Sequence, residues 1–88
     1  MTLYEIFEKL KMEHAQSLAK HGKWKDLPAK SAAERDWKQH DAIEGEFNEW
    51  CEAFGRNDIN GEHGEIEELI DLMNVAARRI MVLTGEDQ

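Results

Sequence analysis

The chain has 88 residues, a net charge of −8 and a single cysteine, Cys51. At this length a monomer buries only about 60–65% of the surface of its unfolded chain, and the sequence offers neither a disulfide nor spaced zinc ligands to compensate. The excess of acidic residues argues against direct binding to nucleic-acid polymers or anionic membranes. The acidity is compatible with a nucleotide substrate bridged by a divalent cation, and equally with simple solubility.

The pattern of apolar residues predicts an all-α fold, because no stretch alternates apolar and polar residues as a strand would. The first helix is expected to begin with Thr2 and Glu5 as a capping box and to end near Gly22. A linker over residues 22–30 follows and contains Pro28, the only proline. The lone cysteine suits a reducing compartment. With no membrane-length apolar run and no signal peptide, a cytoplasmic protein without a membrane span is expected.

Two long helices are predicted in the rest of the chain. The first begins with a second capping box at Ser31 and Glu34 and ends at Gly55. A loop rich in turn-forming residues separates it from the last helix, which is predicted over about Glu62–Thr84. Because the loop is short, the two helices should pack as an antiparallel hairpin within a three-helix protomer.

Both long helices carry apolar side chains at helical spacing, and we expect these stripes to pack. The stripe residues are Trp37, His40, Ile43, Phe47, Trp50, Cys51 and Phe54, then Ile66, Leu69, Ile70, Met73, Ala76, Ala77, Ile80 and Leu83. The whole chain, residues 1–88, is predicted to form one domain, with a tail that frays over residues 85–88. Self-association into a helix bundle, as a homodimer or a dimer of dimers, would supply the missing core.

Four carboxylates stand out beside these stripes. Glu46 and Glu49 lie three residues apart, as do Glu68 and Asp71, so each pair shares one face of its helix. In an antiparallel hairpin the two pairs can meet, and burying them requires neutralisation, for example by a metal. Oxygen ligands alone favour Mg²⁺ or Mn²⁺. The spacing by itself is equally typical of a solvated helix face.

These residues resemble the MazG-like superfamily of all-α nucleoside triphosphate pyrophosphohydrolases. The similarity lies in GEFNEWCEAF over residues 45–54 and ELIDLMNVAARRI over residues 68–80, which reproduce an ExxE, spacer, ExxD motif on two helices. The segment KHGKWKDLP over residues 20–28 is similar to a stretch in small, often phage-borne members. One departure is Gly45, which stands where many members have a further glutamate.

The resemblance implies a magnesium-dependent enzyme that converts a nucleoside triphosphate, ribo or deoxyribo, and water to the monophosphate and pyrophosphate. Glu46, Glu49, Glu68 and Asp71 would be the metal ligands and catalytic residues. Metal-activated water would attack between the α- and β-phosphates, with Glu49 as a candidate to relay the proton. The rival interpretation is a non-catalytic acidic helical module that binds a partner protein.

Five further residues are candidates for substrate binding. Asn74 can hydrogen-bond a sugar or phosphate, or be an ordinary surface residue. Lys23 and Lys25 flank Trp24 and offer positive charge beside an aromatic ring for the base, unless the tryptophan caps the core. Arg78 can neutralise phosphate, or it can act only on the helix dipole.

Overall fold

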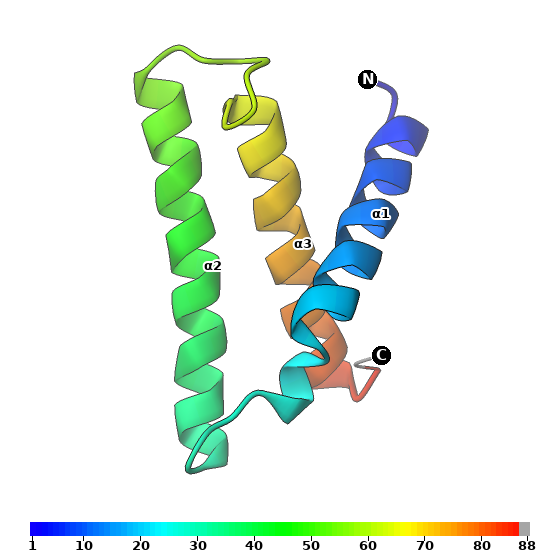
Figure 1. Ribbon diagram of the computed structural model, residues 1–88, viewed down its shortest axis with the longest axis vertical. Helices are drawn as coiled ribbons and strands as arrows, with labels where there is room; N and C mark the ends of the chain where they lie inside the picture. Colours follow the sequence, from blue (N-terminus) through cyan, green and yellow to red (C-terminus); the bar gives the residue numbers. More distant parts are fainter. Residues whose placement is uncertain (87–88) are drawn as a thin grey trace.

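The computed structural model describes residues 1–86, which form helices joined by turns and loops, with no strand among them (Figure 1). The elements are α1 (Leu3–His21), a short 3₁₀ helix η1 (Trp24–Asp26), α2 (Ala32–Gly55) and α3 (Glu65–Thr84). Helices α2 and α3 form an antiparallel hairpin, and α1 lies against α3 and leans away from the hairpin toward its N-terminus (Figure 1). The predicted all-α fold and packed hairpin are confirmed. None of the helices in residues 1–86 has the length and apolar content that a membrane crossing requires.

One of the two predicted capping boxes is complete. The Glu5 backbone N–H donates to Thr2 Oγ1 at 3.1 Å, and the Thr2 N–H donates to Glu5 Oε1 at 3.1 Å. At the start of α2 the Glu34 N–H donates to Ser31 Oγ at 3.1 Å. The Glu34 carboxylate, however, accepts from the N–H of Lys30 at 3.3 Å. The predicted second box is therefore only half formed, because the reciprocal bond reaches one residue further back.

The predicted start of α3 at Glu62 is wrong, since the helix begins at Glu65. The preceding loop folds around Asp58, whose carboxylate accepts from the Gly61 N–H at 2.9 Å and whose carbonyl accepts from the Glu65 N–H at 2.7 Å. A Cβ on Gly61 would lie 2.6 Å from the Asp58 carboxylate oxygens, and one on Gly64 would be 2.7 Å from the Gly61 nitrogen. These close contacts keep residues 62–64 in a turn, so the helix begins three residues later than predicted.

The C-terminal end of α3 is closed by a glycine cap. Gly85 adopts a left-handed conformation with φ 75° and caps the helix, as glycine does without steric cost. The Glu86 N–H donates to the Met81 carbonyl at 2.7 Å. Residues 87–88 of the predicted tail lie outside the described part of the chain.

The interior of the protomer is thin and unusually polar. Among residues 1–86, only Trp24, Ala53 and Ile70 are buried apolar residues, whereas the buried polar or charged residues are Gln39, Glu68, Asn74 and Arg78. Much of the two predicted apolar stripes is exposed instead. The reason is that α1 covers only one side of the hairpin, so the other side has no neighbouring helix in the described part of the chain (Figure 1).

Replacing Gly45 by alanine is expected to stabilise the protein. Gly45 lies within α2, and a Cβ added there would meet no atom within 4 Å. Glycine in a helix interior costs roughly 1 kcal/mol relative to alanine, so thermal unfolding followed by circular dichroism should show a midpoint about 4–8 °C higher. Gly61→Ala, which meets Asp58, should lower the midpoint. An unchanged or lower midpoint for Gly45→Ala would contradict this account.

Candidate metal centre

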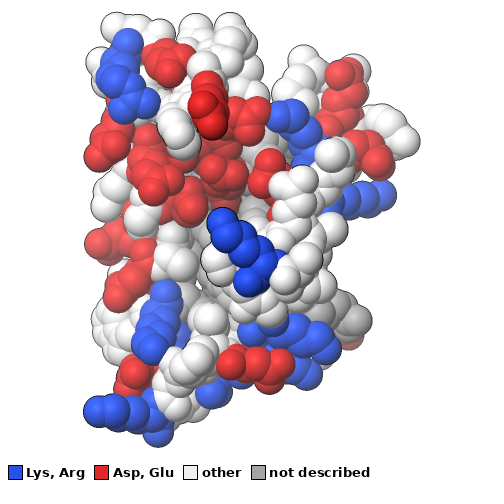
Figure 2. Space-filling model, viewed as in Figure 1, with Lys and Arg blue, Asp and Glu red and all other residues white. Residues whose placement is uncertain are grey.

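Three of the four predicted acidic residues converge in space. Glu46 from α2 and Glu68 and Asp71 from α3 each present one carboxylate oxygen, and these oxygens all lie within 4.8 Å of one another. Figure 2 shows the acidic side chains gathered over the upper half of the face that it presents, above a zone richer in lysine and arginine. The predicted meeting of the acids from the two helices is thus present in the described chain.

The convergence follows from the register of the hairpin. Ala53 is fully buried, so α2 and α3 approach closely near the loop. The indole Nε1–H of Trp50 donates to Glu65 Oε1 at 3.3 Å and links the first turn of α3 to α2. From that point Glu68 lies one turn further along α3, at the level of Glu46 on the antiparallel helix. Because Asp71 follows Glu68 by three residues, its side chain lies on the same side of α3.

The fourth acid, Glu49, lies at the margin of this cluster. Its side chain is exposed and it does not belong to the group of three oxygens. It is still close enough to raise the pKa of both Glu46 and Glu68, by hydrogen bonding and by its charge. Glu49 therefore borders the cluster on its solvent side instead of sharing its centre.

Crowding and burial make these carboxyl groups harder to ionise. Burial, followed by the hydrogen bond and charge of Glu49, raises the pKa of Glu46 from 4.5 to about 7. Burial is also the main cause of the raised pKa values of Glu68 and Asp71, with neighbouring acids next. One buried oxygen each on Glu46 and Glu68, Oε2 in both, has no hydrogen-bond partner. A bound cation would therefore stabilise the ionised form of this cluster.

Without metal, we expect the protein to lose stability as the pH rises. The raised pKa of Glu46 means that the folded state holds this proton more tightly than the unfolded state. The resulting stabilisation is full below 4.5 and is lost as the pH rises through about 7. Unfolding midpoints measured with a chelator between about pH 5 and pH 8 should fall, and Glu46→Gln should flatten the fall. A midpoint that climbs steadily over this range would contradict the prediction.

The donor set fits a hard divalent cation. All ligands in the cluster are carboxylate oxygens, as Mg²⁺ and Mn²⁺ prefer, and the partnerless oxygens of Glu46 and Glu68 are available to an ion. Two ligands about 2.1 Å from one ion lie at most about 4.2 Å apart. The three carboxylate oxygens lie within 4.8 Å of one another, so the side chains would have to move closer together to ligate one ion.

A cavity of about 590 Å³ opens beside the cluster, between α1 and the hairpin. Its volume lies within the range of about 300–1,000 Å³ found for small-ligand sites. The lining residues come from all four elements: Glu13, Gln16, Ser17, Lys20, His21, Trp24, Leu27, Ala42, Glu46, Asp71, Asn74, Val75 and Arg78. Along α3, Asp71 and Arg78 are seven residues, or about 10 Å, apart. The cavity therefore runs from acidic residues toward basic ones.

Asn74 is the best-placed of the five predicted substrate-binding residues. It is only 6% exposed and lines the cavity. Its Nδ2 donates to Ser17 Oγ at 3.1 Å, which fixes the amide, while the buried Oδ1 has no partner. An amide oxygen held in this way can accept a hydrogen bond from a ligand hydroxyl or N–H.

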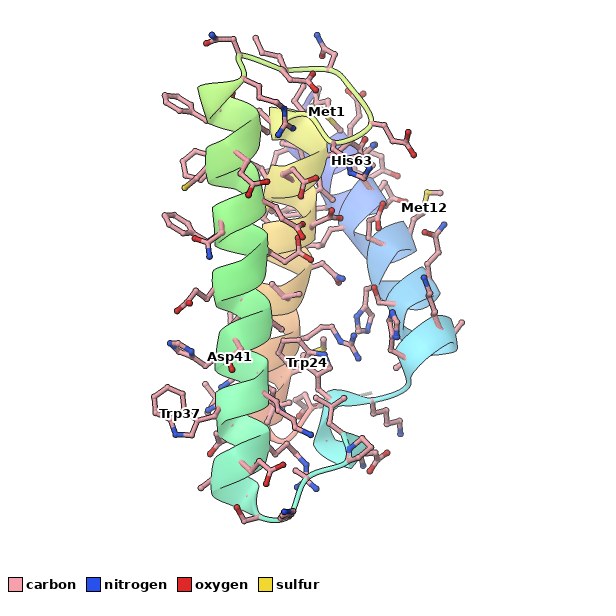
Figure 3. The ribbon with its side chains drawn as sticks, turned by 60° about the vertical axis from the view of Figure 1, so that its left-hand side comes forward. Met1, Met12, Trp24, Trp37, Asp41 and His63 are labelled. Carbon is pink, nitrogen blue, oxygen red and sulfur yellow. The ribbon has the colours of Figure 1, made fainter. Side chains whose placement is uncertain are left out.

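Trp24 and Arg78 line the same cavity as a stacked pair. The Arg78 guanidinium carbon lies 5.1 Å from the Trp24 ring centroid, and its Nη2 donates to the Gly22 carbonyl at 2.6 Å. Both side chains are buried, at 6% and 3% exposure, and Figure 3 shows Trp24 between α1 and the hairpin. Because Arg78 lies over the ring, the pair forms the wall of the cavity, as expected of a tryptophan that caps the core.

Lys23 and Lys25 are exposed, and neither lines the cavity. The cationic side chain that does so on α1 is Lys20, next to His21, and neither was among the predicted substrate-binding residues. The sequence did contain a signal for this cavity-lining face of α1, because Glu13, Ser17 and Lys20 are spaced three or four residues apart and so share one face of the helix.

His63 is a second residue that sequence reasoning missed. Its Nδ1 lies 3.5 Å from Glu68 Oε1. With Glu49, Glu52, Arg56 and Glu68 it lines a second hollow of about 430 Å³ on the loop side of the cluster. No sequence pattern pointed to it, because the folding of the loop around Asp58 determines where His63 lies.

Comparisons with protein-family models, curated proteins and solved structures find no match to this chain.

Proposed function

We propose that this protein is a Mg²⁺-dependent nucleoside triphosphate pyrophosphohydrolase. In the reaction, a water oxygen bonds to the α-phosphorus and the bond from that phosphorus to the α–β bridging oxygen breaks. The products are a nucleoside monophosphate and pyrophosphate. Ribonucleotides and deoxyribonucleotides are both candidate substrates.

The observation that carries the proposal is the convergence of Glu46, Glu68 and Asp71 at one end of a cavity of nucleotide-compatible size. Acidic clusters on a solvated helix face need no such meeting and remain fully hydrated. Here Glu68 is only 3% exposed, and burial raises the pKa of all three groups. Such an arrangement destabilises the protein unless a cation is bound, so its presence favours a metal function.

Mg²⁺ at this cluster would compensate phosphate charge and acidify a bound water. Mn²⁺ is a possible substitute. Side chains of the protein would orient the substrate and accept the proton of the attacking water. Asn74 offers its free amide oxygen to the nucleoside, and Lys20 offers positive charge to the phosphates. Glu49, at the exposed margin of the cluster, is the candidate to accept the proton of the attacking water.

The active form is proposed to be a homo-oligomeric helix bundle, either a dimer or a dimer of dimers. The described residues of the protomer include only three buried apolar side chains, too few for the stable core of a chain of this length. The proposed location is the cytoplasm, because the free, exposed thiol of Cys51 suits a reducing compartment.

A non-catalytic acidic module that binds a partner protein is the rival proposal. Binding through surface acids gives no reason to bury Glu68 or to leave its Oε2 without a partner. The rival also gives no role to the cavity beside the acids.

The direct test is pyrophosphate release from a panel of ribo- and deoxyribonucleoside triphosphates with Mg²⁺. Release of pyrophosphate together with the matching monophosphate from at least one of them, abolished by a chelator, is the expected result. Release of inorganic phosphate and a diphosphate would indicate a different bond cleavage. No turnover of any member of the panel would favour the protein-binding module.

A further inference from the structure

The loop between α2 and α3 contains an asparagine that is followed directly by a glycine, Asn60 and Gly61. The Asn60 side chain is exposed, and the loop forms the turn at one end of the hairpin (Figure 1). The other asparagines, Asn48, Asn57 and Asn74, precede residues that carry a side chain. Because glycine has no Cβ, its backbone nitrogen can approach a preceding side chain without obstruction. Asn60 is therefore the asparagine whose amide the next backbone nitrogen can reach most easily.

The reaction available to this pair is intramolecular, so proximity favours it. The Gly61 nitrogen bonds to Cγ of Asn60, the bond from Cγ to Nδ2 breaks, and ammonia leaves with the proton of the Gly61 N–H. The product is a cyclic imide. Water then opens either of its C–N bonds, which gives an aspartate in the ordinary chain or an isoaspartate in which the backbone runs through the former side chain. Water is the sole co-reactant.

Asp58 opposes this reaction, because it binds the attacking nitrogen. The Gly61 N–H donates to Asp58 Oδ1 at 2.9 Å. Attack requires the nitrogen to lose this proton, and a developing negative charge beside a carboxylate is disfavoured by repulsion. The hydrogen bond to a charged acceptor also stabilises the intact N–H. The contact therefore keeps the Gly61 nitrogen unreactive while the loop is folded.

The rest of the loop holds this nitrogen in place. The Gly64 N–H donates to the Gly61 carbonyl at 2.9 Å, and the Glu65 N–H donates to the Asp58 carbonyl at 2.7 Å. A Cβ on Gly61 would lie 2.6 Å from the Asp58 carboxylate oxygens, so the turn is packed directly against Asp58. Opening of the loop is needed to free the nitrogen, and loops open at a lower free-energy cost than helices do.

We propose that Asn60 is a site of spontaneous deamidation and isoaspartate formation, and that Asp58 restrains the reaction in the folded protein. The exposed amide and the adjacent glycine supply the reacting atoms. The hydrogen bond from Gly61 makes the rate depend on how often the loop opens. The modified fraction consequently grows with the age of the protein and reports the opening of this loop.

The isoaspartate product does not fit the loop as it is folded. It adds one carbon to the backbone inside the turns that the hydrogen bonds of Gly61 and Glu65 to Asp58 close. There is no room for it, since a Cβ on Gly64 would already lie 2.7 Å from the Gly61 nitrogen. Gly64 is the N-cap of α3, and its carbonyl accepts from the Glu68 N–H at 3.0 Å. We therefore expect the isoaspartate form, separated by ion exchange, to unfold at a lower temperature than the unmodified protein.

The test is the rate of mass gain at Asn60 in the full-length protein at mildly alkaline pH, followed by peptide mapping with mass spectrometry. Asp58→Ala removes the acceptor and should raise the rate about ten-fold over wild type. Glu62→Ala is the matched control, because it removes an equal charge from an exposed position of the same loop, and its rate should stay within about two-fold of wild type. Asn60→Gln should abolish the isoaspartate detected by enzymatic methylation.

Equal rates in wild type and Asp58→Ala overturn the proposal. A slower rate in Asp58→Ala also overturns it, since the carboxylate would then promote the attack as a base. Circular dichroism shows whether each variant is folded, and Asn48 and Asn74, both in helices, should gain no mass while it is. If Asp58→Ala is unfolded, Asp58→Asn replaces it, and a rate no higher than that of wild type overturns the proposal. Neither metal nor nucleotide enters these measurements, so their outcome is independent of the hydrolase proposal.

Discussion

Glu68→Gln and Asp71→Asn are expected to lower the turnover number for pyrophosphate release by roughly 1,000-fold or more. Each substitution keeps the shape of the side chain and removes one negative oxygen ligand from the group of three. With the charge gone, the cluster loses affinity for the divalent cation on which the reaction depends. Initial rates of pyrophosphate release at saturating nucleotide and Mg²⁺ measure the effect.

The matched control is Glu62→Gln, an exposed acid in the loop outside the cluster, which should leave the rate within about two-fold of wild type. Loss of folding is not expected to explain the result. Glu68 is buried among other carboxylates, so the neutral Glu68→Gln should unfold at a higher temperature than wild type when metal is absent. Full activity in either cluster variant would end the metal-centre hypothesis.

Mg²⁺ is expected to raise the unfolding midpoint of the wild-type protein on the order of 10 °C. A ligand at 100 times its dissociation constant adds about 2.7 kcal/mol to the stability of the state that binds it. The effect should be larger at pH 8 than at pH 6, because the pKa of Glu46 near 7 makes protons compete with the metal. Differential scanning fluorimetry or calorimetry with and without a chelator measures the shift.

Ionic strength must be matched in this experiment. The chain carries a net charge of −8, so any salt weakens its self-repulsion and stabilises it to some degree. Sodium chloride at equal ionic strength is therefore the reference, and Asp71→Asn is the matched variant. The specific part of the shift should vanish in Asp71→Asn. Equal shifts with Na⁺ and Mg²⁺ in wild type would show screening alone and would contradict a metal site.

Local signals in the sequence were sufficient to predict the helices and the convergence of acidic residues from α2 and α3. The Thr2 capping box and the turn formers after Gly55 mark helix ends through interactions within a few residues. A short loop then forces α2 and α3 to be antiparallel, and three-residue spacing places Glu68 and Asp71 on the same face of α3. Each of these steps depends on chain geometry more than on the identity of distant neighbours.

The details that escaped prediction depend on contacts that helical spacing does not reveal, some within the loop and some between distant residues. The start of α3 depends on Asp58, which accepts hydrogen bonds from the backbone N–H groups of Gly61 and Glu65 and so delays the helix. Burial of Arg78 depends on Trp24 and on the Gly22 carbonyl, both more than fifty residues away. Apolar periodicity identifies which residues share a face, but it cannot tell whether that face packs within the chain or against another molecule.

The attachment of α1 bears on how a ligand would reach the acids. No residue of α1 is fully buried. Lys9 of α1 donates a hydrogen bond to Glu67, and Ser17 accepts one from Asn74. The carbonyl of Gly22, in the adjoining turn, accepts one from Arg78. We therefore expect separation of this helix from α3 to cost less free energy than unfolding of the hairpin. If α1 moves away to admit a ligand, Glu46, Glu68 and Asp71 keep their relative positions, because all three belong to the hairpin.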